Sequence, residues 1–161
     1  INKMLASYAA SKITNAQVNL LDLNDFEMPI YGIDKEKKDG IPAQAKDFKK
    51  LIEHAHGIII SFAEHNGSYS AAYKNLVDWT SRLEGKLWMD TPMFLMATSP
   101  GGRGGSSVLN HALNDYPHRG GQIIESFSLP SFNVNFENGI ISNEELEETL
   151  NKKLALFISN L

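Results

Sequence analysis

Apolar and polar positions follow one another along this chain in two kinds of pattern. Four short apolar runs, bounded by Gly, Pro or polar residues, have the length of buried strands: Val18–Leu23, Ile58–Ala63, Pro92–Thr98 and Gln122–Phe127. Elsewhere apolar residues recur at three- and four-residue spacing, which predicts amphipathic helices. These helices are expected over Asn2–Ile13, from Pro42 to just before Gly57, and over Tyr69–Arg82, Ser107–Tyr116 and Asn143–Asn160.

The order of these elements is a first helix and then strands alternating with helices. Such alternation is typical of parallel βαβ units, so the sequence predicts an α/β fold with a doubly wound parallel sheet in three layers. A chain of 161 residues has the length of one domain. We therefore expect a single domain over residues 1–161.

Composition removes several classes of function. A net charge of −4 and a pI near 5.7 give no support for nucleic-acid binding. The chain has no cysteine, which excludes disulfides and thiolate metal sites, and its five histidines lack metal-ligand spacing. No apolar run reaches the roughly 18 residues of a membrane span, and no signal-peptide pattern opens the chain. We expect a cytoplasmic protein without a metal site or membrane contact.

The segment that follows the third apolar run is rich in glycine. Ser99–Ser106 holds four glycines between a predicted strand and a predicted helix. Such a loop allows a planar or anionic ligand to approach the backbone closely, with amide groups presented by the loop and the helix N-terminus. A turn that needs several residues at positive φ is the alternative, and four glycines exceed that need. Arg103 is either a solvated charge or a contact for an anion.

The segment after the second apolar run is a polar loop. Over Glu64–Ser68 we expect a tight turn, with Gly67 at positive φ and Ser68 as the N-cap of the next helix. An imidazole has a pKa near neutrality, so His65 is a candidate general base. No serine or carboxylate partner is placed for it by the sequence, and we expect no catalytic side chain.

These two loops together resemble those of the NAD(P)H-dependent FMN reductase family, which includes quinone, azo-dye and chromate reductases. The resemblance rests on Ala63–Ser68, which leads to Lys74–Trp79, and on Ser99–Gly105. Asp22–Tyr31 also resembles the family's segment after its second strand. The first family pattern usually reads Pro-Glu-Tyr-Asn-Gly-Ser, whereas this chain has alanine and histidine at the proline and tyrosine positions.

The resemblance implies a flavodoxin-like sheet of order 2-1-3-4-5, with FMN at the carboxyl ends of the strands. NADPH or NADH would reduce the flavin, whose N5 does the chemistry, and a quinone, azo, metal-oxyanion or free-flavin acceptor would reoxidise it. By the same resemblance, Glu64, His65, Asn66 and Gly67 would border the isoalloxazine ring. Ser99, Gly101, Gly102, Arg103 and Gly104 would form the opposite wall.

The family begins with a strand and a Gly-Ser-x-Arg-x-x-Ser-x-Asn phosphate loop that this sequence does not contain. Asn2 stands at the position of the last asparagine of that motif. We therefore expect the domain to be N-terminally incomplete, with its first strand missing. Two alternatives to a reductase stay open: a flavodoxin-like electron carrier without its own nicotinamide turnover, and a scaffold without flavin.

The family also implies self-association. Its members form dimers or tetramers with the flavin near a subunit interface, so we expect a homodimer or homotetramer. The predicted helix Tyr69–Arg82 and the extended segment Ser128–Gly139 are the candidate contacts. The partner in the reaction would be a small-molecule electron acceptor.

Overall fold

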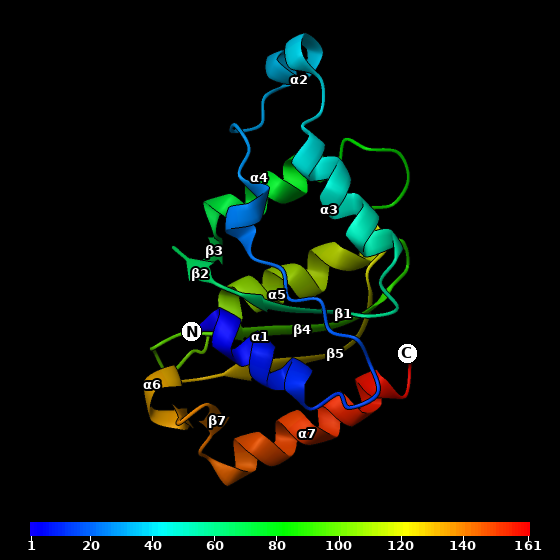
Figure 1. The fold of residues 1–161 in the computed structure, drawn as a ribbon. Helices are drawn as coiled ribbons and strands as arrows, with labels where there is room; N and C mark the ends of the chain where they lie inside the picture. The colour runs from blue at the N-terminus through cyan, green and yellow to red at the C-terminus, as the bar shows by residue number, and fades with distance from the viewer.

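A parallel three-stranded sheet forms the middle layer of the protein (Figure 1). The computed structural model describes residues 1–161. The strands β1 (Ile58–Phe62), β4 (Pro92–Thr98) and β5 (Gln122–Leu129) lie in the order β1-β4-β5. Every residue of β4 except Pro92 is buried, as expected for the central strand of a sheet covered on both faces. The predicted α/β class is confirmed.

Helices cover both faces of this sheet, and two small antiparallel pairs of strands lie beside it. The helices are α1 (Asn2–Ser11), α2 (Ile33–Asp39), α3 (Ala43–Glu53), α4 (Ala71–Thr80), α5 (Ser106–Asp115), α6 (Phe132–Asn135) and α7 (Glu144–Ile158). Short 3-10 turns occupy Leu23–Phe26 and Tyr116–Arg119. The paired short strands are β2 (Glu64–His65) with β3 (Ser68–Tyr69), and β6 (Phe136–Glu137) with β7 (Ile140–Ile141).

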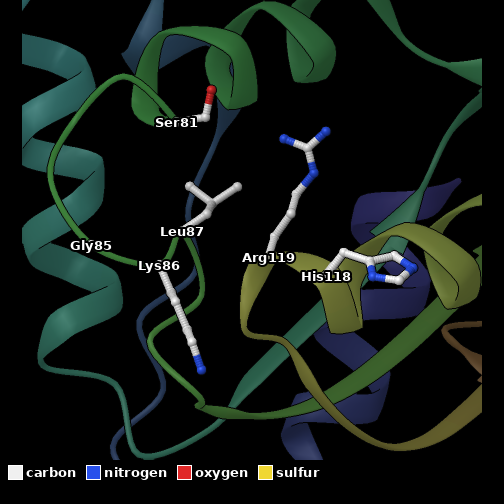
Figure 2. Close-up of a pocket in the computed structure, with 6 residues that line it drawn as sticks. All are labelled: Ser81, Gly85, Lys86, Leu87, His118 and Arg119. Atoms are coloured by element: carbon white, nitrogen blue, oxygen red, sulfur yellow. The ribbon is translucent and has the colours of Figure 1, made fainter.

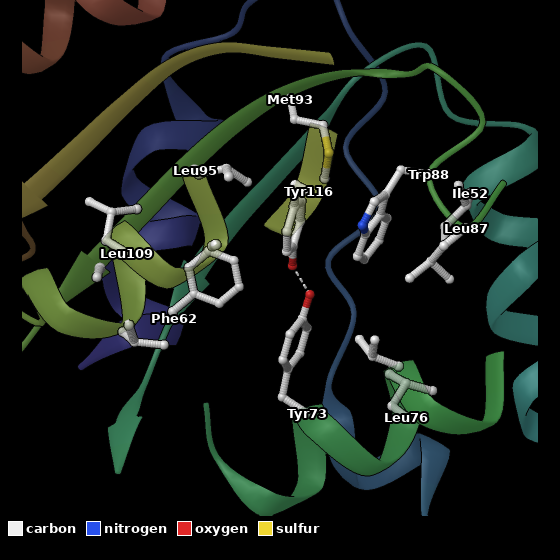
Figure 3. Close-up of a cluster of buried hydrophobic side chains, with 14 of the residues drawn as sticks. Ile52, Phe62, Tyr73, Leu76, Leu87, Trp88, Met93, Leu95, Leu109 and Tyr116 are labelled. Atoms are coloured by element: carbon white, nitrogen blue, oxygen red, sulfur yellow. Dashed lines mark hydrogen bonds between the residues drawn. The ribbon is translucent and has the colours of Figure 1, made fainter. Parts of the chain in front are cut away.

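Each face of the sheet has its own apolar core. On the side of α1 and α7, Leu5 and Leu150 pack with Phe94 of the central strand. On the side of α3, α4 and α5, Phe62 packs within a larger aromatic cluster (Figure 3).

Two tyrosines join α4 to the end of α5 inside the larger core. The hydroxyl groups of Tyr73 and Tyr116 are hydrogen-bonded to each other, as the dashed line in Figure 3 shows. Trp88 stacks on the Tyr116 ring with centroids 4.8 Å apart. Burial raises the pKa of Tyr73 well above its ordinary value, so its hydroxyl stays protonated. Each hydroxyl therefore satisfies the other in a place without water.

The prediction of a strand at Val18–Leu23 is wrong. In the structure this segment is irregular and its residues Val18, Leu20 and Leu21 are exposed. A strand needs a neighbour for its backbone N–H and C=O groups, and the only strand beside β1 is β4. An apolar run therefore predicts a buried strand correctly only where a neighbouring strand is present to pair with it.

Most of the predicted helix starts differ from the observed ones by one or two residues. The N-cap of α4 is Ser70, whose side chain accepts from the Tyr73 amide at 3.3 Å. The N-cap of α7 is Asn143, so this helix begins one residue after its predicted start. In the segment 128–139, predicted to be extended, the chain forms α6 and enters β6. None of the helices combines the length and apolar character that crossing a bilayer requires.

Candidate functional site

The polar loop and the glycine-rich loop meet at the carboxyl end of the sheet. The first follows β1 and the second follows β4, and these strands are parallel neighbours with Phe62 in register with Ala97. The carboxyl ends of parallel strands are where ligands bind in open α/β sheets. The structure therefore brings together the two loops that carry the predicted site residues.

The polar loop is a β-hairpin rather than a tight turn that leads directly into a helix. Asn66 and Gly67 have φ angles of 52° and 77°, and His65 pairs with Ser68 across them. This is the geometry of a type I′ turn, for which Asn-Gly is the preferred dipeptide. Gly67 has positive φ as predicted, but Ser68 is a strand residue and no N-cap. The Asn-Gly dipeptide is the signal that identifies this hairpin, and all four residues from His65 to Ser68 are exposed.

Gly104 and Gly105 are explained by the fold itself. Their φ angles are 56° and 74°, a region that other residues rarely adopt. A Cβ at Gly104 would lie 2.4 Å from the Ser128 Oγ and 2.9 Å from the Leu129 carbonyl carbon. At Gly105 it would lie 2.9 Å from the Cβ of Ala97. These two glycines let the loop pass tightly between β4 and β5.

Gly101 and Gly102 have no such explanation. Neither has positive φ, and a Cβ at Gly102 would have no atom within 4 Å. At Gly101 the nearest neighbour would be the Ser99 Oγ at 3.9 Å. The backbone N–H groups of Gly101, Gly102 and Arg103 donate to no group of the protein. This half of the loop thus offers open space and free donors, which suits close approach of a planar or anionic ligand.

The glycine-rich loop is held from behind by the chain that follows β5. The Ser131 amide donates to the Gly101 carbonyl at 2.9 Å, and the Phe132 amide donates to the Ser99 carbonyl at 3.0 Å. Ser131 has a φ of 47°, which turns the chain toward the loop. Sequence patterns do not indicate this support, because contacts between residues about thirty positions apart leave no local pattern. The protein thus holds two carbonyl groups of the loop, while the amides of residues 101–103 have no partner within the protein.

The Glu64 carboxylate lies against helix α5. Its Oε2 accepts from the Val108 amide at 3.1 Å, in the first turn of that helix. The N-cap of α5 is Gly105, which has no side chain to accept this bond. Glu64 therefore binds the protein through one oxygen of its carboxylate.

Asn2 joins the start of α1 to the ends of two strands. Its Oδ1 accepts from the Thr98 amide at 3.2 Å and from the Ser61 hydroxyl at 2.8 Å. Its Nδ2 donates to the Thr98 carbonyl at 3.4 Å. The asparagine thus lies at the predicted site, where it holds the last residue of β4 directly before the glycine-rich loop.

Arg103 carries the free positive charge of this region. Its side chain is exposed and pairs with no carboxylate. By contrast, Arg82 pairs with Glu36 and Arg119 pairs with Asp115. An unpaired guanidinium beside free backbone donors suits a ligand with anionic or carbonyl oxygens.

The pocket shown in Figure 2 lies at the opposite, amino end of the sheet. It has a volume of about 360 Å³ and is lined by Ser81, Gly85, Lys86, Leu87, His118 and Arg119. Its three basic side chains point in different directions (Figure 2). Lys86 and Arg119 already pair with carboxylates. They therefore do not converge on a common ligand.

A known protein family and several curated proteins are similar to this chain. The family described as NADPH-dependent FMN reductase matches residues 1–134. The quinone reductase of Escherichia coli (strain K12) is 30% identical over 102 residues, which are 63% of this chain and 52% of that protein. The NADPH azoreductase of Bacillus sp. (strain OY1-2) is 30% identical over 108 residues, or 67% of this chain and 56% of that protein. The chain spans about half the length of the curated relatives it matches.

Solved structures show the same fold. The flavoenzyme NAD(P)H:(acceptor) oxidoreductase FerB from Paracoccus denitrificans superposes with a TM-score of 0.74 at 22% identity. That match covers 98% of this chain and 89% of FerB. The apo form of an NADH:FMN oxidoreductase, EmoB, gives a TM-score of 0.67 at 17% identity, covering 99% of this chain and 82% of that one. At these identities the likeness concerns the fold.

Proposed function

Because the chain belongs to the NADPH-dependent FMN reductase family, we propose that it forms the FMN-binding domain of an NAD(P)H-dependent oxidoreductase. The observation that supports this proposal concerns the first two glycines of the glycine-rich loop. Gly101 and Gly102 are glycines that the fold does not require, and they stand beside free amide donors. A flat ring system with polar edges, such as an isoalloxazine, is the kind of ligand that such a surface fits.

FMN, when bound, supplies the hydride and electron transfer, and the protein supplies position and electrostatics. The amides of Gly101, Gly102 and Arg103 would donate to oxygen or nitrogen atoms at the ring edge. The exposed turn Asn66–Gly67 would border the ring from the neighbouring loop. Arg103 would favour the binding of a group that carries negative charge. No side chain at the site forms the hydrogen-bonded pair that a general base needs, so the proposal requires none.

The acceptor we propose is a small oxidised molecule: a quinone, an azo compound, a metal oxyanion or a free flavin. Both loops are exposed at the sheet edge, and such a site places little restriction on the shape of the acceptor. NADPH or NADH would be the electron donor. The quinone reductase and azoreductase names of the relatives support this range of acceptors.

We also propose that the protein acts as a homodimer or homotetramer. Val134, in the segment predicted to contribute to such a contact, is 69% exposed, and Ile140 nearby is 53% exposed. Apolar side chains this exposed are typical of association surfaces when they are grouped. Light scattering coupled to gel filtration measures the mass directly, and a monomer at micromolar concentration would contradict this part of the proposal.

An anaerobic absorption spectrum tests the proposed activity. The full-length protein is reconstituted with FMN, freed of excess cofactor and mixed with NADPH. We expect a flavin spectrum that bleaches on mixing and returns when a quinone is added. A flavin spectrum that stays oxidised would contradict the reductase and favour an electron carrier. A protein that retains no flavin would contradict the binding site itself.

A further inference from the structure

We propose that Glu64 is a positioning residue that fastens the hairpin to α5 and so fixes the two walls of the site relative to each other. This inference rests on the proposed function, because the walls are those assigned to FMN. It concerns the side chain of Glu64, which makes its contact inside the protein. The bond from the Val108 amide to its Oε2, 3.1 Å long, joins residues 44 positions apart.

Helix α5 needs an acceptor from outside itself. In its first turn, the Ser106 amide donates to the Arg103 carbonyl at 3.0 Å and the Leu109 amide donates to the Gly105 carbonyl at 3.2 Å. The Val108 amide has no acceptor on the helix or on its N-cap. In α4 and α7 the side chain of the N-cap residue accepts the corresponding bond. Here the carboxylate of Glu64 occupies that place, and its negative charge suits the positive end of the helix.

The N-cap residue cannot supply the acceptor itself. Gly105 has a φ of 74°, and a Cβ there would lie 2.9 Å from the Cβ of Ala97. The tight passage of the loop over β4 therefore excludes a side chain at this position. The same geometry that makes the loop glycine-rich thus leaves α5 dependent on a cap from the hairpin.

The second strand of the hairpin also contacts α5. Tyr69 is in register with Glu64 across the hairpin, and its ring meets the edge of His111 with centroids 4.9 Å apart. The Tyr69 hydroxyl is buried without a hydrogen-bond partner, so this contact is one of ring packing. Both strands of the hairpin are therefore attached to α5, and only the turn Asn66–Gly67 projects freely. Their attachment sets the distance between this turn and the glycine-rich loop.

Three variants of the full-length protein test the role of Glu64. Glu64→Ala removes the acceptor, Glu64→Gln keeps a carbonyl oxygen for the Val108 amide, and Glu84→Ala removes an exposed carboxylate from a different loop. Loss of a charge-assisted hydrogen bond corresponds to about tenfold or more in an equilibrium constant. FMN affinity is measured by quenching of flavin fluorescence, with the absorption spectrum of the bound flavin as a second signal.

We expect Glu64→Ala to weaken FMN binding about tenfold and to alter the bound-flavin spectrum, because the two walls lose their fixed spacing. Glu64→Gln should restore most of the affinity, and Glu84→Ala should leave it unchanged. In the absence of FMN, amide hydrogen exchange at the first turn of α5 and in the hairpin should be faster in Glu64→Ala than in the unchanged protein. The other two variants should show no such change. Wild-type affinity and spectrum in Glu64→Ala would overturn the inference, as would equal losses in both Glu64 variants. A wild-type protein that does not bind FMN would instead overturn the proposed function, and hydrogen exchange would still decide whether Glu64 caps α5.

Discussion

The two halves of the glycine-rich loop contain the same residue type for different reasons. Gly104 and Gly105 have positive φ and stand where a Cβ would collide with β4 or β5. Gly101 and Gly102 have ordinary φ and open space where a Cβ would be. The first pair is needed for the chain to fold, and the second pair is needed only if something approaches from outside. Substitution of each half should therefore change a different property.

The largest effect is expected from Gly104→Ala. The added methyl group would lie 2.9 Å from backbone atoms of Leu129 and Pro130, which cannot move aside as a side chain can. With the cost of a left-handed φ, we expect a loss of about 2–4 kcal/mol in the free energy of unfolding. Urea unfolding followed by circular dichroism measures it. A loss below about 0.5 kcal/mol would remove the distinction between the halves.

A smaller loss of stability is expected from Tyr73→Phe, which lies away from the loop. The substitution leaves the buried Tyr116 hydroxyl without its partner. An unsatisfied buried hydroxyl costs about 1–3 kcal/mol. FMN affinity, measured at a temperature where the variant is folded, should stay unchanged. Tyr73→Phe thus shows whether a loss of stability is enough to weaken FMN binding. If this variant also lost much of its FMN affinity, the effects of Gly104→Ala on stability and on binding could not be told apart.

Gly102→Ala should produce the opposite result. The methyl group has room in the protein, so the free energy of unfolding should change by less than about 0.5 kcal/mol. The same methyl group would stand between the backbone and a ligand in van der Waals contact with it. We expect FMN affinity to fall about tenfold, which corresponds to roughly 1.4 kcal/mol. Fluorescence titration with FMN measures the change, and Gly32→Ala controls for glycine removal in general, because Gly32 lies outside the loop and likewise has ordinary φ and no atom within 4 Å of an added Cβ.

The smallest effect is expected from Tyr69→Phe. The hydroxyl is buried without a partner, so its removal leaves no group unsatisfied. The ring contact with His111 is kept. Stability should be equal or slightly higher, and FMN affinity should lie within about twofold of the unchanged protein. A clear loss of affinity would mean that the hydroxyl acts on the ligand, and that the hairpin contributes more than its turn.

The sequence predicted the central part of the fold because apolar runs flanked by turn residues define buried strands. This worked for β1, β4 and β5 and failed for Val18–Leu23, where the run has no strand to pair with. Glycine content also located the loop that follows β4. Composition could not divide its four glycines into two kinds, because that division depends on which atoms surround each missing Cβ.

The site was predicted less completely than the fold. The hairpin could have been recognised from Asn66–Gly67, but we expected a tight turn that led directly into a helix capped by Ser68. The cap from Glu64 to Val108 and the support from Ser131 to Gly101 join distant positions, and neither follows from local patterns. The direct role in FMN binding of the residues named from the family resemblance stays a prediction, as do the cytoplasmic location and the incomplete N-terminus.

The central claim is that Gly101 and Gly102 serve a ligand rather than the fold. The double variant Gly101→Ala/Gly102→Ala tests it most directly, in one titration with FMN beside one thermal unfolding curve without FMN. The account predicts a melting temperature within about 2 °C of the unchanged protein and a loss of FMN affinity of more than tenfold. A double variant that binds FMN as tightly as the unchanged protein would contradict the claim.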